Sequence, residues 1–275
     1  WGHNFRFSYL NLADNLRNYC RTLDGQSPAL LALTGTASRS VLRELLTELK
    51  IGKDNSDALI RPLNFDRDEL KFHITKVGTG GDSSAILRGI LNGLPAKFNV
   101  PPGEFFQPAG TATNSGIVFT PFVNGRTHGL FAIKSVIQTA AKVPVTTYAG
   151  SAPKGINPTK WEAEKRVNAQ RFKDNEAPIL VATKAFGMGI DKPNIRWTIH
   201  MGVPSSMEAF YQEVGRAGRD KNLAYCSLIF SEADAEATDK ALASQGSIDD
   251  LRHAATSFKN NNDDISRALF FHLNA

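Results

Sequence analysis

Short runs of apolar residues alternate along the chain with segments in which apolar positions recur every three or four residues. Runs of about four to eight apolar residues are typical of buried strands, and the longer spacing is typical of amphipathic helices. The runs predict strands over residues 28–34, 70–77, 116–120, 143–150, 178–183, 195–202 and 225–230. The spacing predicts helices over residues 38–50, 83–91, 126–141, 158–173 and 205–215. This order predicts an α/β fold, a doubly wound and mainly parallel sheet flanked by helices.

Two segments depart from the alternation. Residues 92–113 contain four prolines and no clear period, which predicts a long loop or an insertion. Residues 233–275 are acidic and alanine-rich and then pass through a polar stretch. They predict a helical extension followed by the start of a further element.

The composition is that of an ordinary folded protein. Hydrophobic residues make up 41% and charged residues 21% of the 275 residues. No apolar run approaches the roughly 20 residues of a membrane span, so no membrane partner is expected. Cys20 and Cys226 lie far apart with no CxxC pair, which predicts neither a metal site nor a disulfide framework. The expected location is therefore a reducing cytoplasm, in a bacterial nucleoid or its equivalent.

Positive charge is concentrated in the first 230 residues. The net charge is +5, and residues 231–275 carry eight acidic against four basic side chains, so residues 1–230 carry +9. A basic surface of this kind can face a polyanion such as nucleic acid. A solvated basic surface without a partner is the alternative.

The segment YQEVGRAGRD, at 211–220, places Arg216 and Arg219 three residues apart, with glycines at 215 and 218. On a helix this spacing directs both guanidiniums to one side. An arginine offers a permanent charge and a planar fork of donors, which suits a phosphoryl group. Facing a nucleoside triphosphate, it can neutralise charge on the γ-phosphoryl group during transfer. The alternative is a helix end with arginines near its carbonyl groups and a glycine stop.

A second glycine-rich segment, KAFGMGIDKP, follows the predicted strand 178–183. Gly187 and Gly189 can expose backbone N–H groups at the carboxyl end of a parallel strand, where ligands bind in open α/β sheets. Thr183 can donate its hydroxyl to a backbone phosphate, and Asp191 can accept from a sugar hydroxyl or orient an arginine. The third glycine of a dinucleotide fingerprint is missing, and a purely structural glycine turn is the alternative.

The first seven residues, WGHNFRF, interleave aromatic side chains with a cation. Trp1, His3, Phe5 and Arg6 can stack on unpaired bases and hold phosphate; aromatic core is the alternative. A further glycine cluster, at 77–84, does not meet the spacing of a phosphate-binding loop and predicts a simple loop.

Together, these segments and their order resemble the RecQ branch of the superfamily 2 nucleic-acid helicases. WGHNFR resembles the tail of that family's aromatic-rich loop, ALTGTAS (32–38) its motif III, and GIVFT (116–120) the start of its motif IV. The segments at 181–193 and 211–220 resemble its motifs V and VI. A DEAD-box RNA helicase would show His-Arg where this chain has Gln-Glu.

The resemblance implies two RecA-like domains that bind ATP and Mg²⁺ between them and move along single-stranded or partially duplex DNA. It implies that Arg219 is an arginine finger and that Arg216 couples it to nucleotide or DNA. Nucleotide contact is implied for Gln212, Gly187, Gly189 and Asp191, and DNA contact for Trp1, His3, Phe5, Arg6, Thr183, Thr34 and Thr36.

Two motifs that the family needs, GxxxxGK[ST] and Asp-Glu-x-His, are absent from the 275 residues. The resemblance implies that both lie in an upstream RecA-like domain in cis, so residues 1–275 alone are expected not to hydrolyse ATP. Residues 1–64 would then end the first RecA-like domain, 65–232 would form the second, and 233–275 would extend it. The expected function is ATP-dependent DNA unwinding, from 3′ to 5′. A non-catalytic nucleic-acid-binding or regulatory module on a helicase fold is the alternative.

Overall fold

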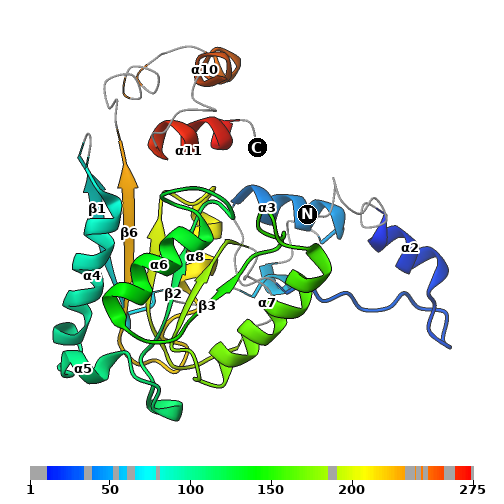
Figure 1. Ribbon diagram of the computed structural model, residues 1–275. Helices are drawn as coiled ribbons and strands as arrows, with labels where there is room; N and C mark the ends of the chain where they lie inside the picture. The colour runs from blue at the N-terminus through cyan, green and yellow to red at the C-terminus, as the bar shows by residue number, and fades with distance from the viewer. Residues whose placement is uncertain are drawn as a thin grey trace. The chain divides into compact units, whose positions relative to one another are not determined.

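The computed structural model describes residues 11–33, 39–51, 56–60, 66–78, 81–184, 191–232, 247–256 and 264–273, with the single residues 239 and 243. The chain divides into two units, residues 1–66 and residues 67–275, whose elements Figure 1 labels. The assignment of the first unit to the end of a first RecA-like domain stays a prediction.

The first unit contains helices α2 (Leu12–Tyr19) and α3 (Arg39–Glu48) and a short 3₁₀ turn, η2 (Ser56–Ala58). Helix α3 confirms the helix predicted over 38–50. The strand predicted over 28–34 is wrong, because residues 28–33 form no strand and Leu31 and Leu33 are more than 80% exposed. A strand needs a hydrogen-bonded neighbour, and the described part of this unit offers none.

The second unit is built on a six-stranded sheet, in which the strand order is β1-β6-β5-β2-β4-β3 and every pair is parallel. The strands are β1 (Leu70–Val77), β2 (Ser115–Phe119), β3 (Val145–Tyr148), β4 (Ile179–Ala182), β5 (Ile195–Met201) and β6 (Ala224–Ser231). The helices between them are α4 (Ser83–Lys97), α5 (Pro102–Phe105), α6 (Leu130–Ala141), α7 (Pro158–Lys173) and α8 (Met207–Val214). The predicted doubly wound parallel fold is confirmed.

Alternate residues of the central strands enter two separate hydrophobic clusters, one on each face of the sheet. In β2, Ile117 joins the cluster that includes α8, and Val118 joins the cluster that includes α4 and α6, which lie side by side on one face in Figure 1. Burial on both faces explains why these strands read as unbroken apolar runs. Gly116 is required by packing, since a Cβ there would lie 1.9 Å from Cε2 of Trp197.

The proline-rich segment 92–113 is not the loose loop that its composition predicts. Helix α4 continues to Lys97 with Pro95 in its last turn, and α5 and a 3₁₀ turn, η3 (Gly110–Ala112), follow. Leu94 and Phe105 are fully buried in the core. Burial of these apolar side chains outweighs the backbone hydrogen bond that a proline removes near a helix end.

Among the residues that the structure describes after β6, those of α10 (Ile248–Ala255) and α11 (Asp264–Leu273) are helical, in agreement with the predicted helical extension. Helix α10 begins with a capping box between Ser247 and Asp250. In the part of the chain that the structure describes, no helix is long and apolar enough to cross a membrane.

Candidate functional site

The loop that carries Arg216 and Arg219, residues 215–223, joins the end of α8 to the start of β6. Both arginines lie beyond the helix, so the predicted arrangement of two guanidiniums one helical turn apart is wrong. The glycines explain the difference. Gly218 has a left-handed φ of +62°, and a Cβ there would lie 2.9 Å from Cγ of Glu69, so this position needs glycine and the chain turns instead of continuing the helix.

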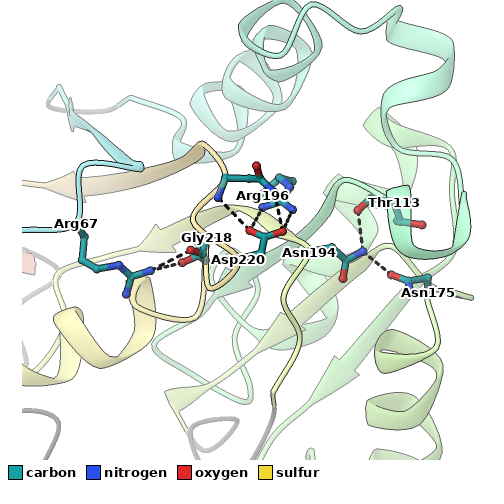
Figure 2. A network of polar contacts seen from close by, with 9 residues as sticks. Arg67, Thr113, Asn175, Asn194, Arg196, Gly218 and Asp220 are labelled. Carbon is teal, nitrogen blue, oxygen red and sulfur yellow. Dashed lines mark hydrogen bonds and ion pairs between the residues drawn. The ribbon is translucent and has the colours of Figure 1, made fainter.

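Residues at the amino ends of the strands fix the backbone of this loop. The Arg67 guanidinium, just before β1, donates to the carbonyl oxygens of Ala217 at 2.9 Å and of Gly218 at 3.3 Å, and Figure 2 shows the Arg67–Gly218 contact. The Gly218 N–H donates to the Ile195 carbonyl oxygen, at the start of β5, at 3.0 Å. The loop therefore lies at the amino edge of the sheet.

A second clamp holds the far end of the loop. The two terminal nitrogens of Arg196, on β5, donate to the two carboxylate oxygens of Asp220 (Figure 2). Asn222 adds its backbone N–H at 3.2 Å and its side-chain amide at 3.0 Å. The Arg196 hydrogen bond is the main reason that the pKa of Asp220 lies well below its usual range. A bidentate pair of this kind fixes geometry as well as charge.

Arg219 is presented at the surface of this clamped loop. Its Nη1 donates to Oδ1 of Asp191 at 2.8 Å, and the two side chains are 36% and 86% exposed. The sequence left two roles open for Asp191, a sugar contact or an arginine contact, and in the structure its carboxylate pairs with an arginine. An ion pair this exposed contributes little to stability, so Arg219 keeps a preferred direction while remaining able to exchange Asp191 for another anion.

Lys192, the residue after Asp191, attaches this segment to the end of α7. Lys192 is almost completely buried. Its ammonium donates to the Lys173 carbonyl oxygen at 3.3 Å and to the Asn175 side-chain oxygen, and it lies 5.1 Å from the centre of the Phe172 ring. Burial lowers the pKa of Lys192 to about 8. The sequence pattern did not single out Lys192, although a lysine near the end of a helix can donate to its last carbonyl groups.

The neighbouring amide network belongs to the same anchor. The Asn194 side chain donates to the Asn175 side-chain oxygen at 2.8 Å and to the Thr113 carbonyl oxygen at 2.9 Å (Figure 2). Asn175 has a left-handed φ of 62°, a conformation that asparagine tolerates better than most residues. These bonds attach the segment that joins Asp191 to β5 to the rest of the second unit.

Arg216, unlike Arg219, is buried. Its pKa is lowered by burial and by the charge of Arg219, and is raised by the charge of Glu213. The two arginines and Glu213 therefore lie within electrostatic reach of one another. Glu213 is also buried, and its Oε2 lies 3.0 Å from Nε2 of the buried His200.

At the opposite edge of the sheet, the carboxyl ends of β1, β5 and β6 surround a cavity of about 280 Å³. Its polar lining includes Ser83, His128, Ser231 and Asp264. The Ser83 hydroxyl and Nε2 of His128 are 2.6 Å apart. Asp264, the first residue of α11, accepts from the Ser231 N–H at 2.9 Å and from its hydroxyl at 3.0 Å. The helical extension thus contributes an acidic group to this edge.

Comparison with known proteins shows what this chain is similar to. Residues 109–221, which include both Asp191 and Arg219, match the model of the helicase conserved C-terminal domain. The chain is 30% identical over 234 residues to the ATP-dependent DNA helicase RecQ of Bacillus subtilis, and 29% identical over 234 residues to the RecQ-like DNA helicase BLM of Xenopus laevis. Each alignment covers 85% of this chain. The chain is related to the RecQ family of helicases.

The RecQ-related chain spans 32% of the length of the Bacillus protein and 14% of that of the Xenopus protein. Among solved structures, it is similar to domain 2 of the DEAD-box helicase Mss116p bound to an RNA duplex, with a TM-score of 0.45 and 16% identity over 73% of this chain and 78% of that chain. The resemblance to RecQ helicases that the motifs predict is confirmed.

Within this RecQ-related domain, the predicted site residues do not form a single group. Thr183 is buried at the carboxyl end of β4, where its N–H donates to the Tyr148 carbonyl oxygen at 3.1 Å. Asp191 lies close before the amino end of β5, at the other edge of the sheet. Thr183 and Asp191 therefore lie at opposite edges of the sheet. Gln212 lies exposed in the last turn of α8.

The other predicted residues lie outside the described part of the chain: Trp1, His3, Phe5, Arg6, Thr34, Thr36, Gly187 and Gly189. Among the residues that are described, no group of three or more His, Cys, Asp or Glu side chains could hold a metal ion.

Proposed function

We propose that this chain is the carboxyl half of an ATP-dependent DNA helicase motor of RecQ type. Its second unit would close on an upstream RecA-like domain, with ATP bound between them as substrate and Mg²⁺ held mainly by the upstream domain. The observation that carries the proposal is Arg219, a half-exposed arginine oriented by Asp191 on a loop clamped at the amino edge of the sheet. Relatives that bear the name ATP-dependent DNA helicase support the same reading.

The chemistry asked of Arg219 is electrostatic. Water attacks the γ-phosphorus in line, the bond to the bridging oxygen of the β-phosphate breaks, and negative charge spreads over the transferring group and the leaving oxygen. A planar guanidinium can meet two of these oxygens at once. Because the ion pair with Asp191 is exposed, exchanging that carboxylate for phosphate oxygens costs little. Gln212, Gly187, Gly189 and Asp191 would line the nucleotide cleft, and Arg216 would couple Arg219 to nucleotide or DNA.

Movement along DNA would follow from closure and opening of the cleft. Domain closure completes a catalytic site, and opening releases product, in many enzymes of hinged architecture. Thr183, Thr34 and Thr36 would couple DNA contact to hydrolysis, and Trp1, His3, Phe5 and Arg6 would stack on bases or hold phosphate. The net charge of +9 on residues 1–230 is consistent with a polyanionic partner.

The test is ATP turnover by the full-length protein with single-stranded DNA, duplex DNA or RNA, combined with unwinding of duplexes that carry a 3′ or a 5′ single-stranded tail. We expect single-stranded DNA to stimulate turnover most and the 3′-tailed duplex to be unwound. Preferential stimulation by duplex DNA or RNA would indicate a translocase or RNA remodeller instead. DNA binding without turnover would indicate the non-catalytic module, and would refute the motor.

A further inference from the structure

A buried histidine contacts a buried glutamate directly behind the loop that carries Arg216 and Arg219. His200 lies on β5 and is 2% exposed, and Glu213 lies in the last turn of α8 with its side chain 11% exposed. Their Nε2 and Oε2 atoms are 3.0 Å apart. The contact joins the middle of the sheet to the helix that leads into the loop.

The surroundings of this pair are apolar. The His200 ring stacks on Phe119, with ring centres 4.7 Å apart, and meets the edge of Phe210 at 5.0 Å. Neither phenylalanine can hydrogen-bond a carboxylate. A buried carboxylate is destabilising unless it is paired, and in the described part of the chain His200 is the one side chain within ion-pair distance of Glu213. Among the described residues, His200 is therefore the polar group that faces the Glu213 carboxylate, in a close contact that lacks the geometry of a hydrogen bond.

Glu213 in turn acts on Arg216. The Arg216 backbone N–H donates to the Glu213 carbonyl oxygen at 3.4 Å, and the Glu213 charge stabilises the charged form of the buried guanidinium, against burial and the charge of Arg219. Because the loop that carries both arginines begins two residues after Glu213, a shift of Glu213 would move the start of that loop.

We infer that His200 is a positioning residue for ATP hydrolysis: its contact with Glu213 fixes the end of α8, and with it the start of the loop that would present Arg219 to the γ-phosphoryl group. The inference rests on the proposed function. His200 touches no reacting atom on this account. Its removal should therefore reduce turnover and leave the binding of nucleotide nearly unchanged.

Two substitutions separate this role from simple packing. His200→Phe keeps a ring on Phe119 and removes the polar contact with Glu213, whereas His200→Gln keeps an amide donor near the position of Nε2. In the full-length protein we expect His200→Phe to lower the kcat for DNA-stimulated ATP turnover about tenfold, with less than about a threefold change in KM for ATP. We expect His200→Gln to restore most of the lost kcat. His73→Phe, at an exposed position on β1, is the matched control and should leave turnover unchanged.

A double-mutant cycle asks whether His200 acts through Glu213. Glu213→Gln alone should lower kcat about as much as His200→Phe, and the double variant should be no worse than either single variant. Additive losses of kcat in the double variant would overturn the inference. An unchanged kcat in His200→Phe, or a failure of His200→Gln to restore kcat, would overturn it as well. So would a loss of kcat that only matches the fraction of protein unfolded in a melting curve. Absence of turnover in the wild-type protein would overturn the proposed function and this inference together, whereas wild-type turnover that is insensitive to His200 would overturn the inference alone.

Discussion

The buried ammonium of Lys192 should make the stability of the second unit depend on pH. Burial lowers the pKa of Lys192 from 10.5 to about 8 in the folded protein. Below pH 8 the side chain is charged both folded and unfolded, so folding carries the whole cost of burying the charge. Between pH 8 and 10.5 the unfolded chain keeps a proton that the folded protein has released. Stability therefore rises with pH across this window.

Lys192→Met isolates this effect, because methionine keeps an apolar chain beside Phe172 and has no ammonium. One pKa unit corresponds to about 1.4 kcal/mol. From the shift between 10.5 and about 8, the free energy of unfolding of the wild type should rise relative to the variant by about 2 kcal/mol between about pH 7.5 and about pH 9.5. The hydrogen bonds lost to Lys173 and Asn175 change the difference by a similar amount at both pH values, so they do not produce this trend.

The assay is urea unfolding at the two pH values, followed by the fluorescence of Trp161 and Trp197, which are both buried in the second unit. The matched control is Lys173→Met, which removes an exposed lysine at the end of α7, the helix that also carries Phe172. This variant should follow the wild-type trend. Parallel pH dependence in the wild type and Lys192→Met would show that Lys192 binds its proton equally in both states, and would refute the argument.

Three further predictions concern packing, the loop clamp and DNA. Gly116→Ala should lower stability by about 1–3 kcal/mol in the same urea assay, since its methyl group would overlap Trp197. Gly89→Ala, on an exposed turn of α4 with open space around it, should instead raise stability by about 0.5–1 kcal/mol. Asp220→Asn should lower stability by about 1.5–3 kcal/mol at neutral pH. Because the pKa of Asp220 is depressed in the folded state, this difference should persist at neutral pH and close only as pH falls below the ordinary value of 3.8. A gap already closed at pH 6 would contradict the clamp. Single-strand affinity of the full-length protein should fall with salt at a log–log slope of about −0.7 for each phosphate neutralised, and a flat response would contradict the polyanion partner.

The central strands of the second unit, β2, β4 and β5, were predictable because burial on both faces leaves an almost unbroken apolar run in the sequence. The same rule misassigned residues 28–34, since an apolar run predicts a strand without showing that a neighbouring strand is present. It also missed the packing of 92–113. Four prolines outweigh other signals in a local reading, whereas the burial of Leu94 and Phe105 depends on contacts with distant parts of the chain.

The candidate site was predictable as a set of residue types and less so as an arrangement. Arginines and glycines at fixed spacing indicated a phosphate-directed loop, and orienting an arginine was one of the two roles left open for Asp191. The sequence did not reveal that Arg216 is buried, because its depth is set by the turn at Gly218 and by the clamp from Arg67. The sequence pattern did not single out His200 either. A histidine inside the apolar strand IRWTIHM was a signal, but its partner Glu213 lies thirteen positions away on a helix.

The most direct test of the central claim, that Arg219 completes a triphosphate site, is the binding of ADP with and without aluminium fluoride to the full-length protein and to Arg219→Ala. Aluminium fluoride beside ADP imitates the transferring phosphoryl group, and an arginine finger acts mainly on that species. We expect Arg219→Ala to weaken the ADP–aluminium fluoride complex by about the same factor as it lowers kcat, at least a hundredfold. The affinity for ADP alone should change little. The control Arg166→Ala, on the exposed surface of α7, should leave the affinities for both complexes unchanged. Equal weakening of both complexes by Arg219→Ala, or no effect on either, would contradict the central claim.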